Sequence, residues 1–249
     1  FSVLKSNISY PLVTTQLFAK ITTNNYSFFA IFLSYFLNFS STFVIYKYRY
    51  CKTTKNMKLL YIHGYNGDPC GESFKNLKIA CADNHELFTI DYNPDYPKNA
   101  IAEIASFVRE NKIDVVIGAS LGGFLAMNLY GVSRIVVNPC WDPAKELPKL
   151  GYEGDIDMYS NLLNTMKDSL DFEEKNLCSG VFANEDELLG DRYIGEFQTY
   201  FNLHFHIEGG HRIDANMAKE IIENILPLHE EATSLYVKQL KEMDNAPWL

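Results

Sequence analysis

Apolar stretches of strand length alternate with segments of helical periodicity from residue 57 onward. MKLLYIH (57–63) is apolar and precedes a glycine turn, which is typical of a buried strand. AIAEIASFVRENK (100–112) instead places Ile101, Ile104 and Val108 on one helical face. The pattern predicts six strands, at residues 57–63, 86–92, 113–119, 133–139, 178–186 and 203–210. It predicts helices at residues 72–82, 100–112, 121–131, 214–228 and 229–243.

This alternation of strands and helices determines the fold class that we expect. Strands separated by helices favour a parallel sheet covered on both faces. We therefore predict a three-layer α/β sandwich, with a mostly parallel sheet of about six strands and helices on both faces. Ligand sites of such sheets lie beyond the carboxyl ends of the strands. The motifs described below all follow predicted strands.

Composition divides the chain at residue 57. Residues 1–56 contain six Lys or Arg, no Asp or Glu and no Gly. Residues 57–249 contain sixteen Lys or Arg and all thirty-one acidic residues. We expect a single domain over residues 57–249, preceded by an extension, residues 1–56, that is not part of it.

Two interpretations of the extension are open. Residues 26–46 form an uncharged run with a cationic flank, long enough for a membrane anchor, which takes ~20 residues. Asn38 and residues 40–42 make its centre polar. Alternatively, the extension is translated upstream sequence and not native protein, because its amino-acid composition is that which AT-rich codons give. We favour this second interpretation, since segments that are not part of the fold are to be excluded first.

Charge and cysteine content limit the partners. The net charge is −9, which opposes a nucleic-acid partner because phosphate binding needs clustered Lys and Arg. The five cysteines form no CxxC pair and no Cys/His spacing that suits zinc. We expect free thiols in a cytoplasmic protein, or a membrane-anchored one if residues 26–46 are a genuine anchor. No metal or other cofactor is expected.

The segment GASLG, residues 118–122, fits the pattern GxSxG. Its position between a predicted strand and a predicted helix is the context that a nucleophile elbow requires. Such a turn holds Ser120 in strained dihedrals, while Gly118 and Gly122 leave room for the neighbouring strand and helix. A plain strand–helix turn would also be rich in Gly and Ser. The segment makes Ser120 the candidate nucleophile.

A serine nucleophile needs a base, which follows it in the chain in α/β-hydrolases. His211 comes directly after IEGG at the end of the last predicted strand, and we take it as the base. His204 and His206 alternate along that strand, so we expect them to face a packed side of the sheet. His229 lies at the start of a predicted helix, far from a strand end.

The orienting acid is expected after the fifth predicted strand, in NEDELL. Asp186 is the candidate that we favour. Glu185 and Glu187 are close enough in sequence to be rivals, and Asp191 is a weaker one. The acid would fix the imidazole tautomer and stabilise the imidazolium.

An oxyanion hole requires backbone N–H groups aimed at the developing negative charge. One is expected from Leu121, directly after the nucleophile. The second is expected from Tyr65, in the loop after the first strand, where Gly64 allows a close backbone approach. His63 precedes the serine, and we interpret it as shaping this loop.

Five segments together resemble those of a known family: LLYIHGYNGDP, VIGASLGGFLA, IVVNPCWDP, NEDELL and IEGGHRI. In order and spacing, over about residues 57–228, they resemble the YqiA-like small bacterial esterases of the α/β-hydrolase superfamily. The resemblance implies a three-layer α/β-hydrolase sandwich, activity on short-chain esters and acyl-CoA thioesters without a cofactor, and a triad of Ser120, Asp186 and His211. One departure concerns the base. The family commonly has a residue between the paired glycines and the histidine, and here His211 follows Gly210 directly.

Residues 139–177, between the fourth and fifth predicted strands, are apolar and include Trp141 and Tyr159. In this fold an insertion at that place forms a lid over the serine, but these residues could equally complete the core. Cys140, beside the site, is interpreted as a small buried residue.

Together these features predict a serine hydrolase that cleaves small carboxylic esters or acyl thioesters through an acyl-serine intermediate. A peptidase or amidase with the same triad is one alternative. A non-catalytic binding protein on a hydrolase scaffold is another. The sequence does not predict an oligomeric state.

Overall fold

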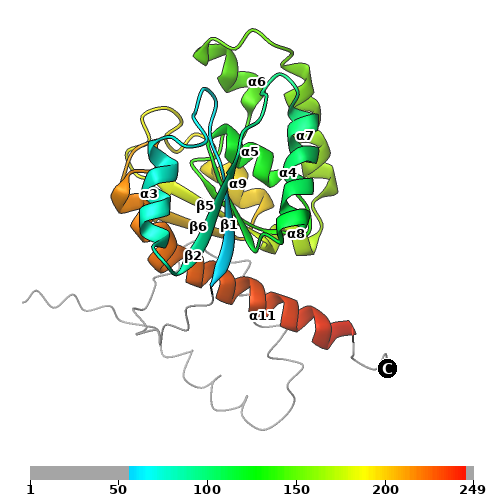
Figure 1. The fold of residues 1–249 in the computed structure, drawn as a ribbon. Helices are drawn as coiled ribbons and strands as arrows, with labels where there is room; N and C mark the ends of the chain where they lie inside the picture. Colours follow the sequence, from blue (N-terminus) through cyan, green and yellow to red (C-terminus); the bar gives the residue numbers. More distant parts are fainter. Residues whose placement is uncertain (1–55, 245–249) are drawn as a thin grey trace, which may run out of the picture. The chain divides into compact units, whose positions relative to one another are not determined.

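A computed structural model describes residues 56–244, with side chains to residue 235. In this part of the chain six strands form one parallel sheet in the order β2-β1-β3-β4-β5-β6 (Figure 1). The strands are β1 (Met57–Ile62), β2 (His85–Ile90), β3 (Val115–Ala119), β4 (Ser133–Val137), β5 (Cys178–Ala183) and β6 (Leu203–Ile207). The predicted fold class is confirmed. Five of the strands end before the predicted residue, so the loops at the carboxyl edge are longer than expected.

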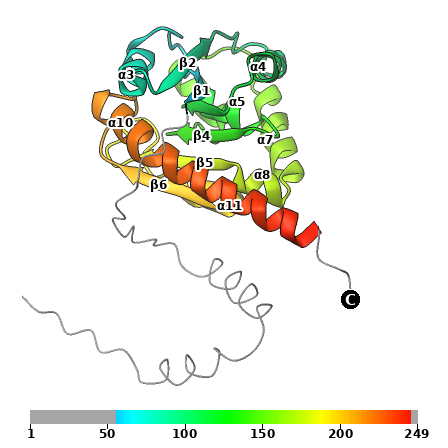
Figure 2. The same ribbon diagram turned by 60° about the horizontal axis from the view of Figure 1, so that its bottom comes forward.

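Two layers of helices cover the sheet (Figure 2). On one face lie α3 (Glu72–Cys81), α10 (Ala215–Glu220) and α11 (Leu226–Asp244). On the other lie α4 (Pro97–Asn111), α5 (Leu121–Met127), α7 (Asp157–Ser169) and α9 (Ile194–Tyr200). Shorter elements are α6 (Pro143–Glu146), the 3₁₀ helix η1 (Leu147–Leu150), α8 (Phe172–Asn176) and the π-helical turn η2 (Ile221–Ile225).

Side chains of β1 show why the inner strands are mainly apolar. Leu60 and Ile62 pack into the core beneath α4 and α5, whereas Leu59 and Tyr61 pack into the core beneath α3 and α10. A strand between two helical layers buries side chains on both faces, so it lacks the apolar–polar alternation of a strand with one solvated face. The edge strands β2 and β6 bury fewer of their side chains. His206 is exposed instead of packed as predicted, because it lies in β6, beyond which residues 56–244 form no further strand.

Two helix boundaries differ from the prediction by three residues or more. Helix α4 begins at Pro97, three residues early, since proline suits the first turn of a helix, where its missing N–H would have no partner. Helix α5 ends at Met127, four residues before Gly131, so Gly131 is not its C-cap. Instead the Gly131 N–H donates to the Glu174 side chain of α8.

The predicted break between residues 228 and 229 is wrong. Helix α10, η2 and α11 form one continuous helical run from Ala215 to Asp244. Pro227 removes one backbone hydrogen bond, and the π-helical turn ends two residues before it. Ile221, Ile222 and Ile225 of that turn are buried, which holds the run against the sheet.

Inside this run His229 is fully buried, and not at a helix start as predicted. Its Nδ1 lies 2.7 Å from the hydroxyl of Ser179 in β5. Burial, together with the positive charge of the buried Arg134, lowers the pKa of His229 to about 4. The folded protein therefore holds this imidazole neutral.

The buried neutral His229 makes stability depend on pH. Its pKa is about 4 in the folded protein against 6.5 for an ordinary histidine, so between these values the unfolded chain binds a proton that the folded chain excludes. The free energy of unfolding should fall by on the order of 3 kcal/mol as the pH drops through this window. Denaturant titrations across the window measure the slope. His229→Asn, which keeps a polar group near Ser179 but does not titrate, should flatten it; equal slopes would contradict the assignment.

The structure does not test whether the chain has a membrane anchor. Residues 26–46, the candidate anchor, and all but the last residue of the extension lie outside the described residues. Within residues 56–244, no helix combines the length and the apolar character needed to cross a bilayer. The four cysteines of this part, Cys70, Cys81, Cys140 and Cys178, are free thiols.

Candidate active site

Ser120 lies at the turn between β3 and α5 in a strained backbone conformation. Its φ is 52° and its ψ is −116°, a region that residues with a side chain rarely adopt. Its backbone is nevertheless fixed on both sides. The N–H donates to the carbonyl of Val137 (3.0 Å), and the carbonyl accepts from the N–H groups of Phe124 (3.2 Å) and Cys140 (3.0 Å). This is the geometry of a nucleophile elbow.

The two glycines that flank the elbow have no room for a side chain. A Cβ on Gly118 would overlap the backbone of Gly122 and Gly123. A Cβ on Gly122 would overlap the carbonyl oxygens of Ile62 and His63, at the end of β1. Both glycines are therefore required by the close approach of strand and helix.

Replacing Gly122 by alanine should damage both stability and activity. The added methyl group must push α5 away from β1, at a cost of about 1–3 kcal/mol or more. Gly195→Ala is a matched control, because that position in α9 has no atom within 4 Å of a new Cβ and an ordinary φ. It should stabilise α9 by up to about 1 kcal/mol. Denaturant unfolding of both variants measures the difference, and equal effects would contradict the steric argument.

Asp186 and His211 are brought together from the loops after β5 and β6. His211 Nδ1 lies 2.9 Å from Asp186 Oδ1, and both side chains are almost fully buried. The same Asp186 oxygen accepts from the N–H groups of Leu188 (2.9 Å) and Leu189 (3.0 Å). An ionised carboxylate only accepts hydrogen bonds, so Nδ1 carries the ring proton and Nε2 is free to act as an acceptor. His211 follows Gly210 directly, without the residue that the family commonly has between the glycines and the histidine, and its contact with Asp186 nevertheless forms.

The pKa of Asp186 reflects these contacts. Burial raises it, but the hydrogen bonds from His211, Leu189 and Leu188 together lower it below the ordinary value of 3.8. The carboxylate is thus held ionised at neutral pH, as an orienting acid requires.

The three other candidates for the orienting acid are placed differently from Asp186. Glu185 and Asp191 are exposed. Glu187 does reach His211, but its Oε2 accepts from the backbone N–H of His211 (2.9 Å) and not from the ring. Among these four carboxylates, the imidazole bonds to Asp186.

The loop after β1 is held in place by His63. Its Nδ1 lies 2.8 Å from the carbonyl of Gly64, and its ring stacks on Tyr92 with centroids 4.7 Å apart. Tyr92 in turn donates its hydroxyl to the carbonyl of His63 (2.9 Å). A Cβ on Gly64 would lie 3.0 Å from Ser120 Cβ, so this loop passes directly over Ser120. The backbone N–H groups of Tyr65 and Leu121, the predicted oxyanion pair, donate to no group in the described part of the chain.

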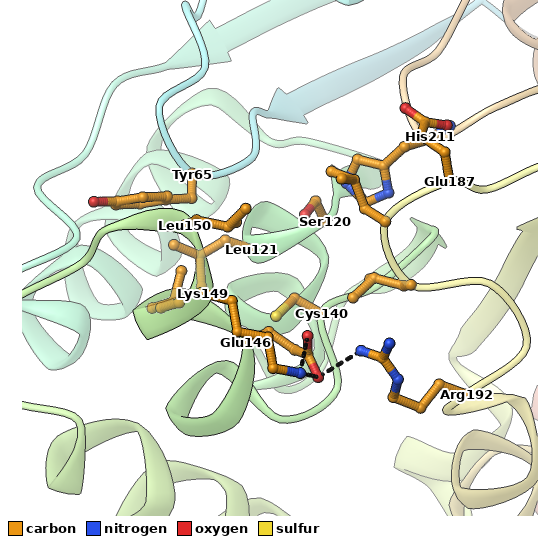
Figure 3. Close-up of a pocket in the computed structure, with 13 residues that line it drawn as sticks. Tyr65, Ser120, Leu121, Cys140, Glu146, Lys149, Leu150, Glu187, Arg192 and His211 are labelled. Atoms are coloured by element: carbon orange, nitrogen blue, oxygen red, sulfur yellow. Dashed lines mark hydrogen bonds and ion pairs between the residues drawn. The ribbon is translucent and has the colours of Figure 1, made fainter.

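A pocket of about 250 Å³ joins these residues (Figure 3). Ser120, His211, Tyr65 and Leu121 all line it. The His211 ring is directed toward Ser120 (Figure 3). Within the described residues the Ser120 hydroxyl makes no hydrogen bond, and such catalytic contacts are often long before a substrate binds. The pocket is otherwise lined by Cys140, Glu146, Leu147, Lys149, Leu150, Glu187, Leu188, Leu189 and Arg192.

An ion cluster, which the sequence did not suggest, forms the wall opposite Ser120 (Figure 3). The buried carboxylate of Glu146 pairs with Lys149 and Arg192, each at 2.8 Å, and accepts from the hydroxyl of Tyr193 (2.6 Å). Burial raises the pKa of Glu146, but these three partners together lower it below its ordinary value. No local pattern marks Glu146, because two of its partners lie more than forty residues away.

Residues 139–177 contribute both to the pocket and to the core. Helix α6 and η1 supply the pocket wall from Glu146 to Leu150. Helix α7 instead packs Tyr159, Leu163 and Met166 into the core. Cys140 is buried, and burial raises the pKa of its thiol far above the ordinary value, as for an inert core cysteine.

No group of three or more His, Cys, Asp or Glu residues in the described part of the chain is placed to hold a metal ion. The described residues thus offer a strained serine, a carboxylate-bound histidine and two free backbone N–H groups around one pocket. A parallel sheet of this order with such an elbow has the α/β-hydrolase fold.

Comparison with known proteins identifies the family. Residues 58–189 match the sequence model of the uncharacterised protein family UPF0227, and the chain belongs to this family. This confirms the resemblance to YqiA-like esterases found in the sequence.

Solved structures show the same fold at low identity. Mouse alpha/beta hydrolase domain-containing protein 10 is 13% identical, with a TM-score of 0.54, over 71% of this chain and 91% of that one. The esterase domain of a Rhodothermus marinus protein is 14% identical, with a TM-score of 0.51, over 74% and 89%. A structure of the metagenome-derived lipolytic enzymes LipS and LipT is 15% identical, with a TM-score of 0.50, over 71% and 94%. At these identities the likeness concerns the fold alone.

Proposed function

We propose that this protein is a serine hydrolase that cleaves carboxylic esters or acyl thioesters through an acyl-serine intermediate. The observation that carries the proposal is the hydrogen bond between Asp186 and His211 beside the strained Ser120, in one pocket. In this proposal the catalytic domain comprises residues 57–249, and the ester or thioester substrate is a small molecule. The lipolytic and esterase names of proteins with this fold agree with the proposal.

The proposed reaction follows from this geometry. His211 Nε2 takes the hydroxyl proton of Ser120 while the Ser120 oxygen bonds to the ester carbonyl carbon. The N–H groups of Leu121 and Tyr65 stabilise the negative charge that forms on the carbonyl oxygen. The imidazolium, stabilised by Asp186, then gives its proton to the leaving alcohol or thiol as the bond to the acyl carbon breaks. Water repeats the sequence on the acyl-serine and releases the acid.

Substitutions at the triad should separate the nucleophile from the orienting acid. Ser120→Ala should abolish turnover of a chromogenic short-chain ester and labelling by a fluorophosphonate probe. Asp186→Asn should lower kcat by about 10⁴-fold, because the imidazole loses its tautomer and its counter-charge. Glu185→Gln is the matched control: this exposed carboxylate is one residue from Asp186 and should be dispensable. Unchanged turnover in Ser120→Ala, or equal effects at residues 185 and 186, would contradict the proposal.

The pocket should favour short acyl groups. Its volume of about 250 Å³ lies below the range of about 300–1,000 Å³ typical of pockets for drug-sized ligands. The far wall is charged, and apolar carbons that reach it would displace ions from their partners. With the leaving group held constant, kcat/KM should rise over the first few acyl carbons, then fall for long chains. A maximum at long chains would contradict this.

Two other activities fit the same residues. A peptidase or amidase would use the same triad, and matched ester and amide substrates separate it from an esterase. A non-catalytic scaffold would leave Ser120 inert toward the fluorophosphonate probe.

A further inference from the structure

The backbone around His211 lies beyond the last hydrogen bonds between β5 and β6. The strands end at Ala183 and Ile207. Two further backbone bonds continue the pairing, from Asn184 N–H to the carbonyl of Ile207 and from Glu185 N–H to the carbonyl of Gly209. Past Gly209 the sheet contributes no bond to the segment that carries the imidazole.

Side chains from other loops hold this segment instead. Asn138 Nδ2 donates to the carbonyls of Gly210 (3.0 Å) and His211 (3.1 Å). From the other side, the Glu187 carboxylate accepts from the His211 N–H (2.9 Å). Both backbone polar groups of His211 are thus bonded to side chains that lie distant in sequence.

The side chain of Asn138 also bonds to the end of β5, and its backbone lies between two residues that bond to Ser120. Its Oδ1 accepts from the N–H of Ala183 (2.8 Å), three residues before Asp186. It directly follows Val137, whose carbonyl binds the Ser120 N–H, and it lies two residues before Cys140, whose N–H binds the Ser120 carbonyl. The side chain is 2% exposed, and its φ of 43° is one that asparagine tolerates better than most residues.

We propose that Asn138 is the positioning residue of the catalytic base: it fixes the backbone of His211 relative to both Ser120 and Asp186. Glu187 is its counterpart on the N–H side of His211. This inference rests on the proposed function, because it assigns His211 the role of base. It gives the amide of Asn138 a task beyond stability, since its two donor bonds end on the base loop and its acceptor bond ends on Ala183, the last residue of β5, after which the acid loop begins.

Two substitutions separate positioning from folding. Asn138→Asp keeps an oxygen for Ala183 N–H but replaces the donor with an acceptor that faces the two carbonyls of the base loop. Asn138→Gly removes the whole side chain and tolerates the positive φ, so it serves if the buried aspartate prevents folding. Asn184→Ala is the matched control. It removes a side-chain bond to Glu208 (2.9 Å) between the same two strand ends, without touching His211.

The readout is kcat for each active site titrated with the fluorophosphonate probe, with KM measured in parallel. Both Asn138 variants should lose roughly 10- to 100-fold in kcat with little change in KM, the scale of a small misplacement of a catalytic group. Glu187→Ala should act in the same direction. Glu187→Gln should restore activity, because its amide oxygen can still accept from the His211 N–H. A folded Asn138→Gly protein with the kcat of Asn184→Ala would overturn the inference.

A second measurement keeps this inference separate from the proposed function. In the NMR spectrum the Nδ1 proton of His211 bonded to Asp186 should be protected from exchange in the unsubstituted protein and in Asn184→Ala. It should be lost in Asn138→Gly. If the unsubstituted protein neither hydrolyses esters nor labels at Ser120, the proposed function fails. Persistence of this proton in Asn138→Gly would overturn the positioning role, whatever the activity.

Discussion

The close approach of α5 to the end of β1 is the constraint on which the rest of the site depends. At Gly122 the helix backbone lies against the carbonyl oxygens of Ile62 and His63, with room for a hydrogen atom only. This contact places Ser120 directly above the sheet edge and brings the Gly64 loop over it. It also forces the strained dihedrals of Ser120. The strain persists because two backbone hydrogen bonds to neighbouring segments, at Val137 and Cys140, and one within α5, at Phe124, fix the turn.

Local features of this structure could be predicted from the sequence, and features that depend on distant contacts could not. The six strands are recognisable because both sheet faces are buried, and the elbow because it lies within five residues. The break expected near Pro227 is absent because buried isoleucines hold the helix together. Asn138 and Glu146 gave no signal of their roles, since their partners lie up to 73 and 47 residues away. The sequence also does not distinguish Asp186, which bonds to the His211 ring, from Glu187, which bonds to the His211 backbone, because both lie in the same short loop.

The sheet carries a serine and a histidine in two different places, with different surroundings. At the carboxyl edge a serine and a histidine line an open pocket. On β5, Ser179 and His229 also form a serine–histidine pair, at 2.7 Å, but both are fully buried. There the imidazole stays neutral because burial and Arg134 oppose its protonation. A serine close to a histidine is therefore not enough to define a catalytic pair. Ser120 and His211 differ from Ser179 and His229 because they line a pocket and because a carboxylate, Asp186, bonds to the imidazole.

The order of the strands has a consequence for partial unfolding. Strand β3, which leads to Ser120, is bonded on both sides, whereas β6, which leads to His211, is an edge strand bonded only to β5. Edge strands and the loops beyond them open at lower free-energy cost than the centre of a sheet. A molecule in which β6 alone has separated keeps Ser120 and most of its core but loses the placement of His211, the proposed base. Denaturant should therefore inactivate the protein before the central strands come apart, and loss of activity would report the detachment of a single strand.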